Sequence, residues 1–147
     1  MIKRKYPEKR LFQPKNKEKY SGKTLPICRS KWEYKFCHYL DNNPNVLNWL
    51  SEEPKIPYIN PNTGTVWKYH PDFLVKIKEG DTIKIKLIEI KPFKQTLQPK
   101  ASKGKRKSTL LKEEQTYAMN SAKWQAAKEF CKKKGWDFLI LTEKELF

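Results

Sequence analysis

The stretch YHPDFLVKIKEGDTIKIKLIEIK, residues 69–91, decides the fold because its pattern is that of two strands joined by a tight turn. Apolar residues alternate with lysines on both sides of Gly80-Asp81, and alternation with a period of two is typical of strands. Glycine at the first of two central positions favours a type II′ turn, which joins antiparallel strands. The stretch therefore predicts an antiparallel hairpin in the middle of the chain.

The turn also determines which side chains of the hairpin lie together. With a two-residue turn at 80–81, Asp72 lies opposite Glu89 and His70 lies opposite Lys91. Side chains alternate between the two faces of a sheet, so all four share one face. Opposed carboxylates repel each other by about 0.2–1 kcal/mol, and a divalent cation between them would turn that repulsion into binding. The hairpin therefore predicts a Mg²⁺ site at which Lys91 orients a water or offsets charge on a phosphate oxygen.

Outside the hairpin, the periodic segments predict the order αβββαβ, an α/β fold with a small mixed sheet flanked by helices. Ser30, with Glu33 three residues later, has the spacing of a capping box at a helix start. Gly135 is a natural helix end, and the apolar strand after it can return parallel to a neighbour. The expected elements are a helix from Ser30 to a stop at 41–44, a strand over 46–59 that Pro54 and Pro57 interrupt, strands over 65–77 and 83–91, a helix over 110–134 that Asn120-Ser121 could divide, and a strand over 136–142.

Length and charge limit the class of protein. The 147 residues make one domain, and we expect a basic N-terminal arm over 1–23 and a single domain over 24–147. Lysine and arginine number 32 against 16 acidic residues, and the net charge of +16 favours a nucleic-acid partner. No apolar run is long enough to span a bilayer, so no membrane partner is expected. The three cysteines have neither disulfide-framework nor zinc-site spacing, which suggests a reducing compartment.

Pro71-Asp72 followed by Glu89-Ile90-Lys91, within this order of elements, resembles the PD-(D/E)xK nuclease superfamily, whose core is restriction-endonuclease-like. The resemblance covers about residues 28–142. Five stretches in order are similar, more narrowly, to the head completion nucleases of T-even-like tailed bacteriophages, and in plan to transposon-end endonucleases of the TnsA type. They are RSKWEYKF (29–36), NPNVLNWLSEEPKIPY (43–58), YHPDFLVKI (69–77), LIEIKPFKQT (87–96) and WDFLILTEKELF (136–147).

This resemblance implies a role for each residue of the motif. Asp72 and Glu89 are then ligands of Mg²⁺, for which Mn²⁺ can substitute, and the carbonyl of Ile90 adds a backbone oxygen. Lys91 is the catalytic lysine of a DNA nuclease with little sequence specificity. Many relatives carry a glutamate on the first helix, and Glu33 occupies that place. The alternative for Glu33 is a purely structural role in capping that helix.

Further residues are candidates for accessory roles. His70 precedes the Pro-Asp pair and either contacts phosphate or water or is structural. Gln115 stands where some relatives carry a glutamine or lysine on the helix after the third strand. A basic stretch that follows the third strand is expected to track the phosphate backbone of double-stranded DNA near the cut, with a solvated loop as the alternative. Its charged residues are Lys100, Lys103, Lys105, Arg106 and Lys107.

Three other functions compete with that of a phage head completion nuclease. A non-catalytic DNA-binding or head-assembly protein could keep the fold, but here both carboxylates and the lysine are present. A basic RNA-binding or ribosomal protein would explain the charge but not the acidic pair. A DNA repair or transposon endonuclease would use the same core. The phage resemblance implies portal, neck or head proteins as partners, and a location in the host cytoplasm during assembly or in the virion.

Overall fold

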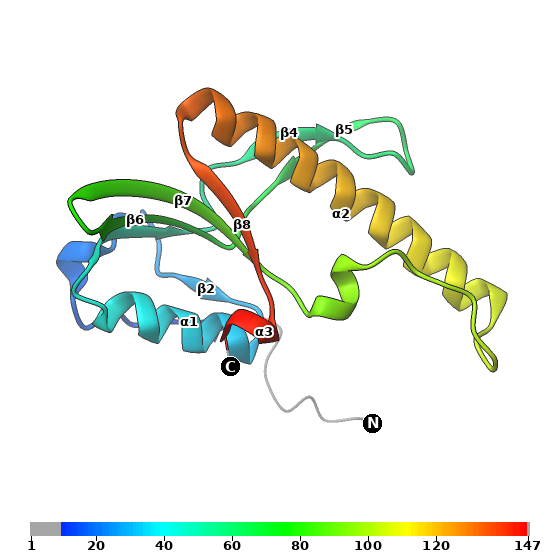
Figure 1. Ribbon diagram of the computed structural model, residues 1–147, viewed down its shortest axis with the longest axis horizontal. Helices are drawn as coiled ribbons and strands as arrows, with labels where there is room; N and C mark the ends of the chain where they lie inside the picture. The colour runs from blue at the N-terminus through cyan, green and yellow to red at the C-terminus, as the bar shows by residue number, and fades with distance from the viewer. Residues whose placement is uncertain (1–9, 147) are drawn as a thin grey trace.

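A four-stranded mixed sheet forms the centre of the protein (Figure 1). The structure is a computed structural model that describes residues 10–146. In spatial order the strands are β3 (Val46–Ser51), β6 (Phe73–Glu79), β7 (Thr82–Ile90) and β8 (Asp137–Leu141). Antiparallel pairing joins β3 to β6 and β6 to β7, whereas β8 runs parallel to β7. The predicted mixed sheet and the parallel return of its last strand are therefore confirmed.

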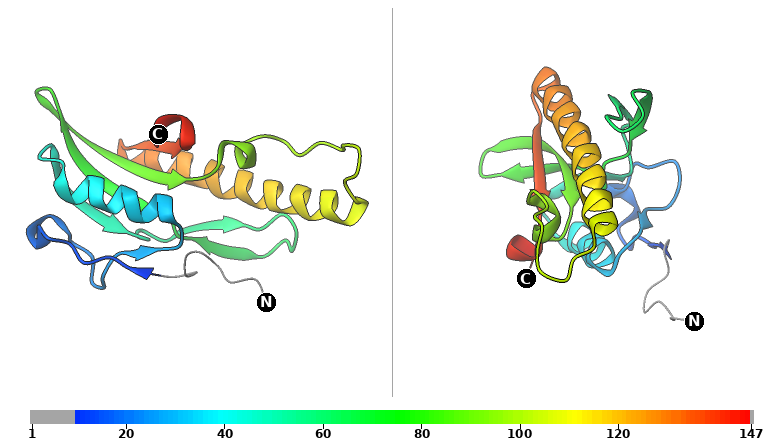
Figure 2. Two further views of the ribbon diagram at one scale, coloured as in Figure 1. Left: turned by 90° about the horizontal axis from the view of Figure 1, so that it is seen from below. Right: turned by 90° about the vertical axis from the view of Figure 1, so that its right-hand side faces the viewer.

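Helices cover both faces of this sheet, so the fold has three layers (Figures 1 and 2). The helix α1, Lys31–Asn42, packs on one face, and the long helix α2, Lys107–Lys134, packs on the other. A short helix, α3 (Glu143–Leu146), follows β8. Buried residues on the α1 side include Leu40, Val75 and Ile88, and those on the α2 side include Leu87, Trp124 and Ala127.

The central hairpin has the register that its turn predicts. Glu79 pairs with Thr82, and the ladder continues without a shift to Phe73 and Ile88. Gly80 has a φ of 61°, the left-handed value that a type II′ turn requires at its first central position. The two-residue turn therefore brings the start of β6 beside the end of β7.

Two of the predicted strands are divided at a proline: the interruption of the first at Pro54 is confirmed, whereas the division of the second was not predicted. The expected strand over 46–59 ends as β3 at Ser51 and resumes as β4, Ile56–Ile59, after Pro54. The expected strand over 65–77 is divided in the same way, into β5 (Val66–Tyr69) and β6, on either side of Pro71. Proline cannot donate to a strand ladder. Consequently β4 and β5 leave the main sheet and form a separate antiparallel pair beside α2 (Figure 1).

The predicted long helix is continuous, and Asn120-Ser121 does not divide it. Asn120 is buried at the start of the half of the helix that packs on the sheet and on β4, so the weak helix propensity of two residues does not end it. Gly135 caps the helix in the left-handed conformation, as predicted. Of the helices in residues 10–146, none combines the length and low polarity that crossing a membrane requires.

The described part of the predicted N-terminal arm is folded against the core. Short strands β1 (Arg10–Leu11) and β2 (Ile27–Cys28) pair with each other, with the turn η1 (Lys17–Lys19) between them. Two aromatic residues of this segment, Phe12 and Tyr20, pack against the ring of Trp49. Burial of these rings outweighs the charge of the segment, so the prediction of an extended arm to residue 23 is wrong from residue 10 onward. Residues 1–9 of the predicted arm lie outside the described residues.

Two cysteines that are nine residues apart in the sequence lie in contact in this core. The sulfur atoms of Cys28 and Cys37 are 3.3 Å apart, and both side chains are fully buried. Cys131 is buried separately on the α2 side. The three cysteines of the described chain are free thiols and serve as small core residues.

Asp41, in the last turn of α1, holds the N-terminal segment by hydrogen bonds. We expect it to be a major determinant of stability. Its side chain is 1% exposed and accepts the backbone N–H groups of Lys15 and Asn16 at 2.9 and 3.0 Å. Asp41→Ala leaves both donors without this acceptor, so we expect unfolding free energy to fall by about 2 kcal/mol. Denaturant unfolding measures this loss. The exposed Glu18→Ala in the same segment is the control, and an equal effect of both changes would contradict the prediction.

Candidate active site

Three acidic side chains and the predicted catalytic lysine, Lys91, line a single pocket at the end of the sheet, and Arg29 and Lys31 also line it. The pocket has a volume of about 470 Å³ and lies between the start of α1 and the end of β7. Glu33 enters it from α1, Asp72 from the residue before β6, and Glu89 and Lys91 from the end of β7. Four residues that are up to 58 positions apart in the sequence therefore share one small volume.

Asp72 is tied to the neighbouring strand through its side chain. The β6–β7 ladder ends at Phe73 and Ile88, one pair before the predicted Asp72–Glu89 pair. Instead of a further ladder pair, the Asp72 Oδ2 atom accepts the backbone N–H of Ile90 at 2.7 Å. This bond fixes the carboxylate at the end of β7, beside Glu89 as the hairpin predicts.

Glu89 is held at one oxygen, and its other oxygen faces Lys91. The hydroxyl of Tyr69 donates to Oε2 in a short hydrogen bond, while Oε1 lies 3.8 Å from Nζ of Lys91. Ile88 packs on the α1 side of the sheet and Leu87 on the α2 side, so alternation places Glu89 on the α2 side with Tyr69. The side chain is buried and oriented by its neighbours.

Glu33 both caps α1 and lines the pocket. Its backbone N–H donates to Ser30 Oγ at 3.2 Å, so Ser30 caps α1 as predicted. Its carboxylate accepts the Ser30 hydroxyl at 3.0 Å and the backbone N–H of Arg29 at 3.3 Å. The same buried carboxylate lines the pocket. The capping hydrogen bonds therefore hold the Glu33 carboxylate in the pocket with Asp72 and Glu89, and one side chain can cap the helix and line the pocket at the same time.

Burial makes the three carboxyl groups hard to ionise. It is the main cause that raises the pKa of Asp72 well above its ordinary value, and the charges of Glu89 and Glu33 raise it further. Burial likewise raises the pKa of Glu89, against the opposing effect of Lys91, and raises the pKa of Glu33. A cation in this pocket would stabilise the ionised forms.

The donor set fits a cation that keeps part of its water shell. Within residues 10–146, no group of three or more acidic, histidine or cysteine side chains is arranged to enclose a metal ion. Asp72 and Glu89 do supply two carboxylates in one pocket, and Ile90 lines it between them. Mg²⁺ usually retains several waters and takes only one or two protein carboxylates. The site therefore suits Mg²⁺ better than a fully protein-coordinated ion.

Two predicted accessory residues lie away from the pocket. His70 is exposed, and the ladder ends before it can pair with Lys91, whose backbone N–H bonds instead to Leu141 of β8. The break at Pro71 removes the register on which the His70 prediction depends. Gln115 is exposed on α2, and its carbonyl accepts the side-chain N–H of Asn62. His70 and Gln115 therefore do not line the pocket that holds Asp72 and Glu89.

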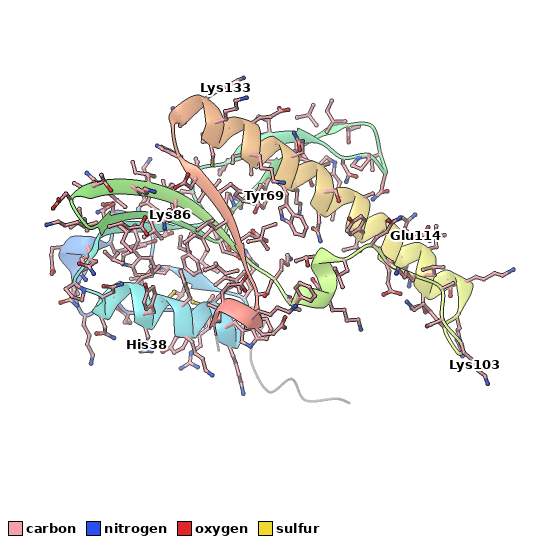
Figure 3. The ribbon with its side chains drawn as sticks, viewed as in Figure 1. His38, Tyr69, Lys86, Lys103, Glu114 and Lys133 are labelled. Carbon is pink, nitrogen blue, oxygen red and sulfur yellow. The ribbon has the colours of Figure 1, made fainter. Side chains whose placement is uncertain are left out.

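Four residues near the site were not expected from the sequence. Tyr69 lies between the sheet and α2 (Figure 3), and Lys123 of α2 has its Nζ 5.8 Å from the centre of the Tyr69 ring. Arg29 and Gln95 also line the pocket, and Glu52 accepts the Nε–H of Arg29 at 2.8 Å. Tyr69 stands three residues before Asp72 at the end of a strand, which is the one signal that could have indicated it.

The basic stretch forms a loop that leads away from the pocket. After β7, a single turn η2 (Phe93–Thr96) connects to a loop that ends where α2 begins. Lys103 lies at the tip of this loop and points outward (Figure 3). Lys105 turns back toward α2, with its Nζ 3.0 Å from Glu113.

The comparisons with known proteins agree with this architecture. The sequence profile of the TnsA-like endonuclease N-terminal family matches residues 43–143, a range that contains Asp72, Glu89 and Lys91. The chain is also similar to the head completion nuclease of Enterobacteria phage T4, with 37% identity over 137 residues. That alignment covers 90% of this chain and 89% of the phage protein. The chain therefore belongs to the TnsA-like endonuclease N-terminal family.

Proposed function

We propose that this protein is a metal-dependent DNA nuclease that hydrolyses phosphodiester bonds with low sequence specificity. The observation that carries the proposal is the meeting of Glu33, Asp72 and Glu89 with Lys91 in one pocket. Two buried acids, Glu33 and Glu89, beside the half-buried Asp72 destabilise a fold unless a cation or a proton neutralises them. The similarity to an endonuclease family and to a phage nuclease supports the same activity.

Asp72, Glu89 and the carbonyl of Ile90 would hold Mg²⁺ or Mn²⁺ in this site. A cation there supplies Lewis-acid chemistry for the attack of water on a phosphodiester. The bond from the Ile90 N–H keeps Asp72 in place, and Tyr69 keeps Glu89 in place. The Lys91 ammonium is partly exposed beside Glu89, where it can orient the attacking water or offset charge on a phosphate oxygen.

The DNA substrate is expected to lie along the basic surface beside the pocket. The net charge of +16 provides sequence-independent attraction to phosphates. The basic loop follows the pocket in the chain after the single turn η2, so its side chains can contact the phosphate backbone near the cut. These residues are Lys100, Lys103, Lys105, Arg106 and Lys107. Such contacts position DNA without reading bases, which supports low specificity.

The phage relative suggests the stage at which the nuclease acts. That protein is named a head completion nuclease, and we propose that this chain also finishes a packaged head before head–tail joining. Its partners would then be portal, neck or head proteins, met in the host cytoplasm during assembly or in the virion. A purely structural head protein is the second candidate, but such a protein would gain nothing from clustering three acids in one pocket.

A cleavage assay on linear and circular DNA tests the activity. With Mg²⁺ we expect the purified protein to cut, and with EDTA we expect no cutting. Cutting of circular DNA identifies an endonuclease, whereas cutting of linear DNA alone identifies an exonuclease. Protein that binds DNA but cuts neither substrate with Mg²⁺ or Mn²⁺ would contradict the proposal and favour the structural candidate.

Tyr69 is expected to act as a positioning residue through its bond to Glu89. Tyr69→Phe removes only the hydroxyl that donates to Glu89 Oε2. We expect a 10- to 100-fold higher Mg²⁺ requirement, about the effect of losing a hydrogen bond that orients a metal ligand. Cleavage measured over a range of Mg²⁺ concentrations, together with Mn²⁺ binding, tests this expectation.

Tyr58 offers a matched control for this change. Its hydroxyl is buried without a hydrogen-bond partner among the described residues, and its ring lies 5.9 Å from the same Lys123 Nζ. Tyr58→Phe should therefore leave the Mg²⁺ requirement unchanged. Equal effects of the two substitutions would show that Tyr69 matters only for packing.

A further inference from the structure

A second, larger cavity continues from the active-site pocket along α2. Its volume is about 960 Å³, and it lies between the η2 loop, residues 93–106, and the first half of α2. Pro92 and Gln95 line both this groove and the active-site pocket. A chain that leaves the active site in this direction would therefore enter the groove directly.

The helix face that lines the groove is polar. Thr109, Lys112, Thr116 and Asn120 recur at helical spacing and line the groove. Farther along the same helix, the positions that pack on the sheet are apolar. A helix face that is built to pack against protein is apolar, so the first half of α2 faces the loop across a space suited to a polar occupant.

The charge of the groove is strongly positive. Four lysines line it, and Glu113 is the single acidic residue among the described residues of its lining. Lys105 already neutralises that acid at 3.0 Å. The remaining positive charge comes from Lys94, Lys100 and Lys112. Lysines at the walls of a groove are suited to a chain of phosphates.

The groove also offers apolar surface for bases. Leu97 is 51% exposed at the loop wall, and the partly buried ring of Tyr117 lies on the helix wall. A base lacking its partner strand can pack or stack on such side chains, whereas paired bases inside a duplex cannot. Cavities of this size accommodate ligands of drug-like size, which corresponds to a few nucleotides and is much smaller than a double helix.

We propose that this groove binds a single-stranded segment of the DNA whose backbone passes through the active site. The preferred substrate is then duplex DNA with a single-stranded tail, cut near the junction. This inference rests on the proposed nuclease function and adds to it the structure of the DNA. The outward residues Lys103, Arg106 and Lys107 do not line the groove and would contact the duplex.

Two charge-matched variants test the proposal. The groove variant carries Lys94→Ala, Lys100→Ala and Lys112→Ala, and the control carries Lys103→Ala, Arg106→Ala and Lys107→Ala. The substrates are one blunt duplex and the same duplex with a 5′ or a 3′ tail of about 10 nucleotides, a length within the site size of single-strand-binding grooves. Cleavage is measured with Mg²⁺, and binding is measured in EDTA by fluorescence anisotropy.

We expect the parent protein to bind and cut at least one tailed duplex about tenfold better than the blunt duplex, the effect of about one stacked base. The groove variant should lose this difference. The control variant should keep the difference while binding all substrates more weakly and with a smaller salt dependence.

The outcomes separate this inference from the nuclease proposal. A parent that cuts blunt and tailed duplexes equally is a nuclease without a single-strand groove, which overturns the inference alone. A groove variant that retains the tail preference also overturns it. If the parent cuts no substrate, the nuclease proposal fails, but binding measured in EDTA still tests the groove. A preference for tailed duplex, and its loss in the groove variant, can be measured without cleavage.

Discussion

Asp72→Asn is expected to abolish DNA cleavage, with a loss of about 1,000-fold, while DNA binding stays intact or becomes slightly tighter. The loss is large because the change removes one of two carboxylates that would hold the cation, and preorganised charge is a major part of catalysis at such sites. The amide oxygen of asparagine can still accept the N–H of Ile90, so the local geometry should survive. Glu89→Gln should behave in the same way.

The same variant is expected to be more stable than the parent in the absence of metal. Burial and the neighbouring carboxylates raise the pKa of Asp72, so the folded state binds the proton more tightly than the unfolded state does. Stability of the parent therefore falls as pH rises through the range between these two pKa values. The gain from Asp72→Asn should be small at the ordinary pKa of an aspartate and should grow as the pH rises above it.

Thermal unfolding in EDTA at several pH values measures this difference. If Asp72→Asn unfolds the protein or lowers its melting temperature at neutral pH, then the aspartate is structural. The assignment of a cation site would then lose its main support.

Lys91→Ala is expected to abolish cleavage as completely as Asp72→Asn does, but without a loss of cation binding. The ammonium lies 3.8 Å from Glu89 Oε1 and is not a metal ligand, so cation binding should persist. DNA binding should also persist, because one of 32 basic residues is lost. Cleavage by Lys91→Ala is compared with cleavage by Lys76→Ala, which removes an exposed lysine on β6. Full activity of Lys91→Ala would exclude a catalytic role for this lysine.

The hairpin was predictable because one turn fixes every pair of its ladder. Gly80 determines the register, and the register brings Asp72 beside the strand that carries Glu89 and Lys91. The capping role of Ser30 and the helix end at Gly135 were predictable for a similar reason, since each depends on backbone groups within a few residues. The central part of the site could thus be predicted from local patterns.

The errors arise where local patterns compete with packing. Phe12 and Tyr20 fold a highly charged segment onto the core, because burying aromatic surface outweighs the polarity of the neighbouring residues. Pro71 divides a strand whose hydrophobic pattern continues across it. Because β5 pairs with β4 in a separate sheet, the Tyr69 hydroxyl reaches Glu89, whereas His70 is exposed away from the pocket. The period-two alternation of an unbroken strand places His70, and not Tyr69, on the face of Asp72 and Glu89, so it could not predict this arrangement.

The most direct test of the central claim is a calorimetric titration of Mn²⁺ into the metal-free protein without DNA. The parent and Lys91→Ala should bind Mn²⁺ with similar affinity, whereas Asp72→Asn and Glu89→Gln should bind it much more weakly or not at all. This pattern would identify Asp72 and Glu89 as the cation ligands and Lys91 as a residue needed only for the reaction. A parent that binds no Mn²⁺, or an Asp72→Asn variant that binds it like the parent, would contradict the account.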